Sequence, residues 1–507
     1  MSTLTRRSLA AAVASVVAAA TLVISAPHAA ALVSRNWNDF NDDGYADLAV
    51  GAPNDDVGSH GGAGVVNVIY GSANGLKSAG NQVWQQDLVH GPGGAGAGTG
   101  NHFGTALATG DFNDDGYADL AVGAPDEDVS GHANAGAVVI IYGGPSGLTA
   151  SGSQALSPNP VAGAEFGAAL VALDAWDTSG VSPVKGADSH ADLAVGKPGT
   201  NEFFAFPGSA SGLETPAAAS YTCGSANGRC GAVLAAGDID GDGVDELVAG
   251  APDSKVGALD GAGEVVIESK SGSLSGVDLT ESNVSGDSAA ANAHFGAALA
   301  VGDVAPYGND DLLIGAPDRA VTFHSTSVAG AGVFDEFQGS SSGISASLSE
   351  NEGSANVPDN PETGDHFGTA IAIGDFGKGS GLDLAVGAPG ENVSGQKAAG
   401  AVIVLYPDLS SGFWTQDDPG VGGIATKKDL LGQTLYAADF GRSNQADLAI
   451  GVLLADNGSA LDAGEITVLY GTSANGLVAA HSQLWSQNSP GIGEKSQSGD
   501  HFSAAMH

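Results

Sequence analysis

The chain has 507 residues, with 58 Asp and Glu against 16 Lys and Arg, so its formal net charge is −42. A nucleic-acid-binding protein needs clustered basic residues to displace counterions from phosphate, and an anionic membrane surface repels an acidic chain, so this charge argues against both partners. The 42% hydrophobic content is enough for a core, which argues against disorder, and the 79 glycines follow no three-residue period, which excludes collagen.

Residues 1–31 have the organisation of a signal peptide. Arg6 and Arg7 form a charged start, residues 10–25 are apolar, and residues 29–31 are alanines that offer a cleavage site. The arginine pair also resembles a twin-arginine signal, so the Sec and Tat routes both remain open. The apolar run is short for an uncleaved anchor. We expect a secreted protein with no membrane span after cleavage.

One sequence unit recurs along residues 32–507. The phrase DLAVGAP begins at Asp47 and returns, with variants, in six later copies. A phrase such as HFGTALATGD, from His102, precedes it, and a β-branched run such as AGAVVIIYGG, from Ala135, follows it. The aspartates that end the HFGTALATGD-type phrases, counted from Asp39, lie 63 to 72 residues apart. The repeat therefore fills the mature chain as one domain.

Each repeat predicts four β-strands. The first two phrases alternate small apolar residues, the third is β-branched, and a weaker segment such as residues 82–84 follows. One four-stranded sheet cannot bury both of its faces, but seven sheets packed radially can. We therefore predict an all-β, seven-bladed β-propeller, in which the alanines and glycines of the inner strands fit a crowded centre.

Three repeats carry the pattern D-x-[DN]-x-D-G-x-x-[DE] between their first two strands. Oxygens at positions one, three and five converge, glycine at six permits the turn, position seven offers its carbonyl, and position nine adds a carboxylate. Hard oxygen donors select Ca²⁺ over softer metals. The expected ligands of three Ca²⁺ sites are Asp39, Asn41, Asp43, Tyr45, Asp47, Asp111, Asn113, Asp115, Tyr117, Asp119, Asp238, Asp240, Asp242, Val244 and Glu246.

Two other structures compete with a calcium site as the explanation of these loops. An EF-hand needs a glutamate at position twelve, where this chain has Val50, Val122 and Ala249, and it needs flanking helices. An Asx-rich turn without metal explains one loop, but three copies at matched positions favour a cation. The remaining four loops have lost ligands, and we expect no tight calcium at the loops beginning at Asp174, Asp303, Asp375 and Asp439.

The two cysteines of the chain, Cys223 and Cys230, are expected to form a disulfide. An even count suits the oxidising environment of an exported protein, and two cysteines without a nearby histidine do not make a zinc site.

The end of the chain predicts how the ring closes. Residues 501–507 copy the strand that is missing before Asp39, so we expect them to complete the first blade. In the alternative, residues 32–37 form that inner strand and the tail begins a truncated eighth repeat.

The motifs FG, DxDxDG and GAP, in this order, resemble the FG-GAP repeats of the integrin alpha-subunit propeller. The resemblance covers residues 39–507 and implies calcium between the first two strands of a blade. It also implies ligand binding on the opposite face, built here by loops such as 54–62, 90–101 and 126–134. The sequence shows no stalk, no transmembrane helix and no inserted domain, so it resembles a secreted bacterial-type relative.

We therefore expect a non-catalytic binding or adhesion module, monomeric, for an extracellular protein or glycan. The alternatives are a secreted hydrolase or lyase that uses the propeller cleft on polysaccharide or lipid, and a structural envelope protein. Glu127, Asp128 and Glu391 are the candidate catalytic carboxylates of the enzyme alternative. The recurring histidines favour a structural role; they are His102, His294, His366 and His501.

Overall fold

The computed structural model describes residues 38–175, 190–224, 227–270, 274–284, 288–304 and 308–507. They belong to one compact unit, Asn36–His507. The predicted signal peptide, residues 1–31, and the alternative inner strand, residues 32–37, lie outside the described residues. No helix in the described part of the chain is long and apolar enough to cross a membrane.

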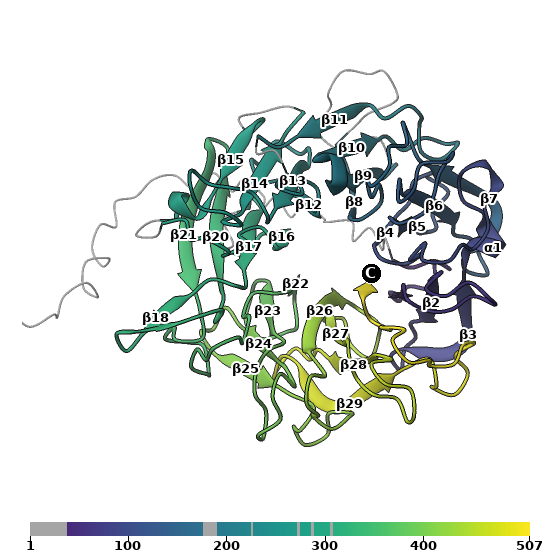
Figure 1. Cartoon of the computed structure of the whole chain (residues 1–507). Coiled ribbons are helices and arrows are strands. Elements are labelled where there is room, and N and C mark those ends of the chain that lie inside the picture. The colour runs from purple at the N-terminus through teal and green to yellow at the C-terminus, as the bar shows by residue number, and fades with distance from the viewer. Residues whose placement is uncertain (1–37, 176–189, 225–226, 271–273, 285–287, 305–307) are drawn as a thin grey trace, which may run out of the picture. The chain divides into compact units, whose positions relative to one another are not determined.

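Seven four-stranded antiparallel sheets form the blades of a ring, as predicted (Figure 1). Blade 1 contains β30 (Ala505–Met506), β1 (Leu48–Ala52), β2 (Val65–Tyr70) and β3 (Lys77–Trp84). Blade 2 contains β4 (Leu107–Gly110), β5 (Asp119–Ala124), β6 (Ala137–Tyr142) and β7 (Thr149–Leu156). Blade 3 contains β8 (Leu170–Leu173), β9 (Asp192–Lys197), β10 (Glu202–Phe206) and β11 (Ala219–Thr222). Blade 4 contains β12 (Val233–Gly237), β13 (Glu246–Ala251), β14 (Glu264–Glu268) and β15 (Val277–Leu279).

The remaining blades follow the same order from the centre outward. Blade 5 contains β16 (Ala298–Gly302), β17 (Asp311–Ala316), β20 (Val333–Ser340) and β21 (Gly343–Glu350). Blade 6 contains β22 (Ile371–Gly374), β23 (Asp383–Ala388), β24 (Ala401–Leu405) and β25 (Ser411–Trp414). Blade 7 contains β26 (Leu431–Ala438), β27 (Asp447–Val452), β28 (Glu465–Tyr470) and β29 (Val478–Trp485). Outside the blades lie β18 (Val321–Phe323), β19 (Thr326–Val328), α1 (Gln86–Val89), η1 (Pro92–Gly94), η2 (Pro198–Thr200) and η3 (Glu281–Asn283).

The C-terminal strand closes the ring. Val50 pairs with Met506 and Gly51 with Ala505, so β30 is the inner strand of blade 1. The backbones of Ala49 and His507 exchange two further hydrogen bonds, of 2.8 and 3.0 Å. The prediction that the tail completes the first blade is thereby confirmed, and the free edge of β1 is covered.

The FG and GAP motifs join neighbouring blades. The buried Phe103 ring precedes blade 2, and its backbone N–H donates to the Ala63 carbonyl of blade 1 at 3.0 Å. In GAP, a Cβ on Gly123 would lie 2.0 Å from the Gly167 carbonyl oxygen of the next blade, so only glycine allows this approach. Side chains from adjacent blades then fill common apolar clusters, such as the one shared by Val66, Leu120 and Val139.

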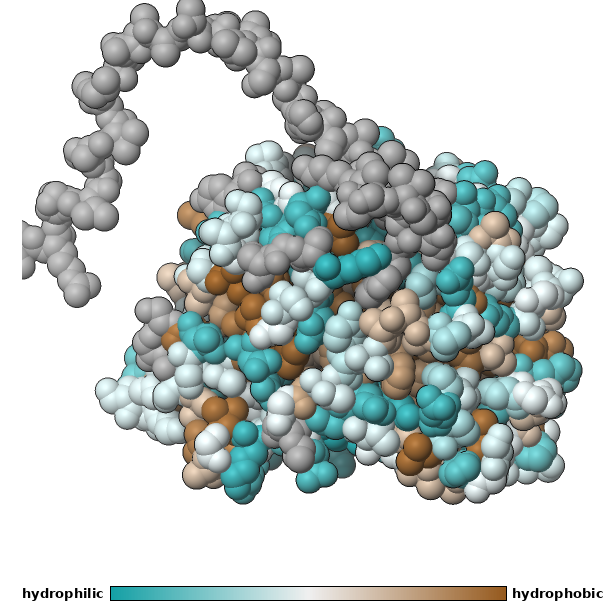
Figure 2. All heavy atoms as spheres, turned by 90° about the horizontal axis from the view of Figure 1, so that it is seen from above, coloured by the Kyte–Doolittle hydropathy of each residue, from teal (hydrophilic) through white to brown (hydrophobic). Residues whose placement is uncertain are grey.

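Small side chains line the axial channel, which encloses about 300 Å³. Ala106, Ala169, Ala232, Ala298 and Ala370 come from the start of successive blades. The predicted small side chains therefore lie at the centre, but the channel is open and larger side chains such as Leu107, Leu170 and Leu234 line it too. From the side, hydrophilic residues and small apolar patches are interspersed over the rim (Figure 2).

Strand order fixes two faces of the ring. Loops from the first to the second strand of a blade, and turns from the third to the fourth, lie on one face, which we call the lower face. The other loops, including residues 54–62, 90–101 and 126–134, lie on the opposite, upper face.

Candidate metal centre

The three predicted calcium loops, residues 39–47, 111–119 and 238–246, are called the acidic loops. In blade 1, Asp39 folds the loop around its carboxylate, which accepts from the N–H groups of Asp43 (3.1 Å) and Gly44 (2.7 Å). In blade 2, Asp111 accepts in the same way from Asp115 (3.1 Å) and Gly116 (2.9 Å). The glycines at position six have φ of +87°, +90° and +90°, as the predicted sharp turn requires; they are Gly44, Gly116 and Gly243.

The blade 4 loop gathers its carboxylates most tightly. Single oxygens of Asp238, Asp240 and Glu246 lie within 4.8 Å of one another. Oδ1 of Asp238 is buried and has no hydrogen-bond partner. Asp242 at position five accepts from the N–H of Val244 at 3.0 Å. This loop thus presents a group of oxygens that can hold a cation.

The blade 1 and blade 2 loops are more open. Within the described chain, no oxygens of three carboxylates in these two loops lie within 4.8 Å of one another. Asp43 instead contacts Lys77, with Nζ 3.3 Å from Oδ2, on the exposed surface. Asn113 holds Asp115 through its amide, with Nδ2 3.1 Å from Oδ2. The predicted ligands therefore share a loop but differ in how closely they converge.

Position nine has a role that the sequence analysis missed. Both oxygens of Asp119 accept backbone N–H groups, from Phe112 and Gly143, each at 2.9 Å. Asp447 of blade 7 does the same with Phe440 and Gly471, although its loop has Gly441 and Ser443 in place of the ligands at positions three and five. This carboxylate thus ties the loop to the end of the third strand whether or not the loop can hold a metal.

Burial raises the pKa of carboxyl groups in the acidic loops. Desolvation raises the pKa of Asp47 and of Asp119 to about 8, against the backbone N–H groups that lower it. Desolvation likewise raises the pKa of Glu246 to about 7. A cation among these oxygens would reverse such shifts, because it favours the charged form.

The degenerate loops of blades 6 and 7 differ in backbone path. Position three is Gly377 (φ +98°) and Gly441 (φ +114°). A Cβ there would lie 2.5 Å from the Thr472 carbonyl oxygen and 1.9 Å from that of Ser72, respectively. A ligand side chain therefore has no room at position three of either loop.

The same two loops carry a basic residue at position four. Lys378 Nζ lies 4.9 Å from the ring centre of Tyr406, and the Arg442 guanidinium lies 4.8 Å from that of Tyr470. Arg442 also acts to lower the pKa of Asp447, which burial raises to about 8. The acidic loops have Asp42, Asp114 and Gly241 at this position. The degenerate loops beginning at Asp174 and Asp303 lie partly outside the described residues.

The recurring histidines make one repeated contact on the upper face. Nδ1 of His102 lies 2.7 Å from Asp126, and Nδ1 of His294 and His366 lie 2.6 and 2.8 Å from the two oxygens of Asp318. His501 contacts Asn54 in the same way, at 2.9 Å. Each histidine thus joins the start of a blade to the loop after GAP, which supports their structural interpretation.

The other predicted features are found at separate places. Cys223 and Cys230 form the expected disulfide, with Cα atoms 5.7 Å apart. Glu127 is buried and accepts from the amide of Gln86 at 2.5 Å, whereas the neighbouring Asp128 accepts from the Asn134 N–H at 2.9 Å in an exposed contact. Glu391 lies at a different blade junction, so the three candidate catalytic carboxylates do not form one site.

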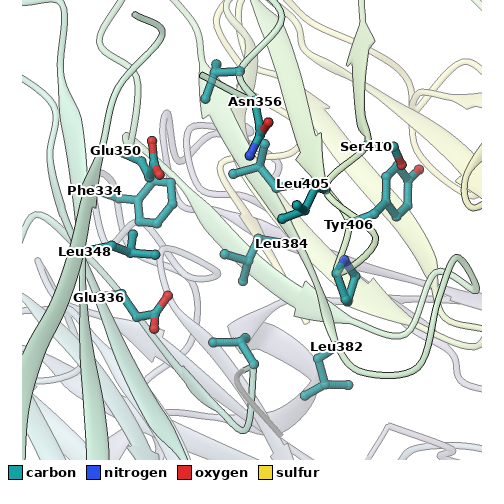
Figure 3. A pocket seen from close by; sticks show the side chains of 14 residues that line it. Phe334, Glu336, Leu348, Glu350, Asn356, Leu382, Leu384, Leu405, Tyr406 and Ser410 are labelled. Atoms are coloured by element: carbon teal, nitrogen blue, oxygen red, sulfur yellow. The ribbon is translucent and has the colours of Figure 1, made fainter. Parts of the chain in front are cut away.

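A pocket of about 300 Å³ lies between blades 5 and 6 (Figure 3). Phe334 and Leu348 face Leu384 and Leu405 across it, and Glu336 and Glu350 line the blade 5 side. Burial raises the pKa of Glu336. No local sequence pattern indicates this pocket, because its walls come from two different repeats.

The comparisons with known proteins agree with the fold. Residues 103–141 and 231–267 match the FG-GAP repeat family. The chain is 35% identical over 142 residues to phosphatidylinositol-glycan-specific phospholipase D of Mus musculus, covering 28% of this chain and 16% of that protein. It is 32% identical over 174 residues to integrin alpha-PS5 of Drosophila melanogaster, covering 33% of this chain and 15% of that protein.

A crystal structure of a protein from Lactobacillus plantarum aligns with a TM-score of 0.45 and 10% identity, over 91% of this chain and 98% of that one. The matches to phosphatidylinositol-glycan-specific phospholipase D and to integrin alpha-PS5 span only 16% and 15% of the length of those proteins. Together with the observed blades, they identify the chain as a seven-bladed β-propeller that carries FG-GAP repeats and is homologous in part to integrin alpha chains.

Proposed function

We propose that the chain is a secreted, calcium-binding propeller that acts as a non-catalytic binding or adhesion module for an extracellular protein or glycan. The contrast between loops carries the calcium part of this proposal. Lys378 and Arg442 supply positive charge at position four of the degenerate loops, and the acidic loops have no base at that position. A hard divalent cation bound to the acidic loops supplies the charge that they lack.

Export is supported by the disulfide between Cys223 and Cys230, because such bonds persist in oxidising compartments. Extracellular modules also meet enough calcium to fill sites with dissociation constants of about 10⁻⁴ to 10⁻³ M. The open acidic loops of blades 1 and 2 suit affinities in that range.

Exposed apolar side chains favour the upper face as the ligand surface. Leu88, Val161, Ile424 and Leu461 lie on its loops and are exposed, Ile424 by 74%. Apolar contacts in the centre of an interface supply much of its binding energy. On the lower face, Leu409 is 72% exposed in the turn between β24 and β25 and serves as a matched control.

The calcium part is tested by thermal unfolding in calcium and in chelator, because a ligand that binds only the native state raises its melting temperature. The triple variant Asp43→Ala, Asp115→Ala, Asp242→Ala removes position five from all three acidic loops and should abolish the calcium-dependent shift. Ser443→Ala, at position five of the blade 7 loop, should leave that shift intact. An equal calcium shift in wild type and triple variant would refute the proposal.

The binding part is tested on immobilised matrix glycoproteins and polysaccharides. Ile424→Asp and Leu461→Asp should weaken capture by tenfold or more, whereas Leu409→Asp should not. Capture lost in Leu409→Asp and kept in the two upper-face variants would contradict the choice of face.

A hydrolase or lyase acting on lipid or polysaccharide is the second candidate. Its support is the similarity to a segment of phosphatidylinositol-glycan-specific phospholipase D. The described residues that line the axial channel include no carboxylate, histidine or cysteine, so such chemistry would need another site. Turnover of a phosphatidylinositol-glycan or a polysaccharide by the purified protein would favour this candidate over the binding module.

A further inference from the structure

Three sequence positions meet at the junctions between blades, under the upper face. One position follows the outer strand of a blade, with a single residue between them. Another lies two residues before the Phe or Leu of the FG motif in the next blade. The last lies three residues beyond the end of that next blade's DLAVGAP strand. We call this meeting point the junction socket.

Other sockets balance their acids with amides or a base. Between blades 1 and 2, Gln86 donates to Glu127 at 2.5 Å and accepts from Asn101 at 2.7 Å. Between blades 4 and 5, Arg319 pairs with the buried Glu281 at 2.9 Å.

Between blades 7 and 1, the socket holds Gln487 and two buried acids, Asp55 and Asp500, and the nearby Gln497 adds a second amide. Gln487 and Gln497 both donate to Asp55, at 2.6 and 2.9 Å. Between blades 6 and 7, the socket holds the buried Gln416 and a single acid, Asp429. An acid in these sockets is thus accompanied by an amide or a base.

The socket between blades 5 and 6 breaks this rule. Its three residues are Glu352, Asp365 and Glu391, and all three are buried, with exposures of 0%, 0% and 6%. One oxygen from each lies within 4.8 Å of the other two. Among the described residues, no lysine or arginine forms an ion pair with any of them.

The unpartnered atoms point to a ligand. Neither carboxylate oxygen of the fully buried Glu352 accepts a hydrogen bond from an amide, hydroxyl or basic donor, and neither does Oδ1 of Asp365 or Oε2 of Glu391. Only a proton shared between Glu352 and Asp365 would join these two carboxyls by a hydrogen bond. The remaining oxygens of Asp365 and Glu391 accept the backbone N–H groups of Glu362 and Asn392. Isolated buried carboxylates of this kind are costly unless they are paired or coordinate a metal.

We propose that Glu352, Asp365 and Glu391 form a buried Ca²⁺ site between blades 5 and 6, separate from the acidic loops. Three carboxylates offer six hard oxygens, of which four accept no backbone N–H group, and such oxygens suit the coordination of Ca²⁺. The site joins the outer strand of one blade to two loops of the next, so the ion acts as a clamp at a junction where other sockets use amides or an arginine.

Glu352→Gln tests the site with little risk to the fold, because Gln86, Gln416 and Gln487 occupy the same position in other sockets. Bound calcium per chain is measured by equilibrium dialysis of the full protein with radiolabelled calcium. Glu352→Gln should lose one ion per chain relative to wild type. Glu127→Gln, in the socket where Gln86 already donates, should lose none.

The triple variant of the acidic loops separates this site from those loops. It should retain one ion, and adding Glu352→Gln should remove that ion. If wild type binds a single ion that only Glu352→Gln removes, the clamp stands and the acidic loops are empty.

Desolvation raises the pKa of all three carboxyls when no cation is bound, and repulsion from nearby acids, which include Asp359 and Glu362, adds to it. Protons are therefore the competing way to neutralise the socket. An unchanged calcium count in Glu352→Gln and in a second variant, Glu391→Gln, would show that protons fill this role and would overturn the proposal.

Discussion

The position-nine aspartate allows its structural role to be separated from metal binding. Asp119 and Asp447 make the same two hydrogen bonds to backbone N–H groups, at 2.9 Å, but only Asp119 belongs to an acidic loop. Asparagine has one oxygen, so Asp→Asn keeps one acceptor and turns an amide N–H₂ towards the other donor. We therefore expect both Asp119→Asn and Asp447→Asn to destabilise the propeller.

The size of the effect follows from the lost bond. A hydrogen bond to a charged group contributes about 1.5–3 kcal/mol, and the stranded backbone N–H adds a desolvation cost, so each variant should lose about 2–4 kcal/mol in chelator. At a calcium concentration one hundredfold above the dissociation constant, one occupied site stabilises the native state by about 2.7 kcal/mol. Asp119→Asn should lose this amount in addition to its loss in chelator. Asp447→Asn should show no such additional loss.

Denaturant unfolding followed by tryptophan fluorescence measures both variants in both buffers, with the slope checked against wild type. If Asp447→Asn leaves the free energy of unfolding unchanged, the structural role of this carboxylate is refuted. A calcium-dependent loss in Asp447→Asn as large as that in Asp119→Asn would refute the division into acidic and degenerate loops.

Three further predictions concern the last histidine of the chain, a degenerate loop and the FG motif. Burial lowers the pKa of His507 to about 4, so between about pH 6.5 and 4 the unfolded chain binds a proton that the folded chain does not. The free energy of unfolding should therefore decrease as the pH is lowered through this window. A pH titration of stability should be flatter there for His507→Asn, and a profile identical to that of wild type would contradict this. Gly441→Ala should cost about 1–3 kcal/mol equally in calcium and chelator, because its Cβ would meet the Ser72 carbonyl, and a neutral result in thermal unfolding would count against the backbone path. Phe367→Ala should cost about 3–5 kcal/mol in denaturant unfolding, whereas Phe367→Leu should cost much less because Leu431 occupies this position in blade 7; equal losses would argue against simple packing.

The ring could be predicted from the sequence because its repeat is regular. Seven copies of the DLAVGAP phrase fix the number of blades, and the copy of the FG strand at residues 501–507 fixes the closure, which the pairing of Ala505 with Gly51 confirms. The lengths of the outer strands were less predictable, because those segments carry weak patterns and differ between blades.

The calcium loops were located by their motif, but their differences were not predicted. The sequence retains Asp192, Asp383 and Asp447 where other ligands are lost, and this was a usable signal that position nine has a structural role. Lys378 and Arg442 at position four were a second usable signal, because they mark loops that supply positive charge from their own side chains. The positive φ of Gly441, in contrast, depends on packing against Ser72 of another blade, which no local pattern shows.

The junction socket was beyond sequence reasoning for a physical reason. Glu391 was singled out as one loop carboxylate among many, but its partners Glu352 and Asp365 come from the end of one blade and the start of the next. Their convergence depends on strand register and on the angle between blades.

Anomalous difference density from crystals grown in calcium tests the central claim most directly. The account predicts peaks at the oxygens of Asp39, Asp111 and Asp238 in blades 1, 2 and 4, and no peak in the loops beginning at Asp375 and Asp439. Acidic loops without a peak, or peaks in the two loops that carry Lys378 and Arg442, would contradict it.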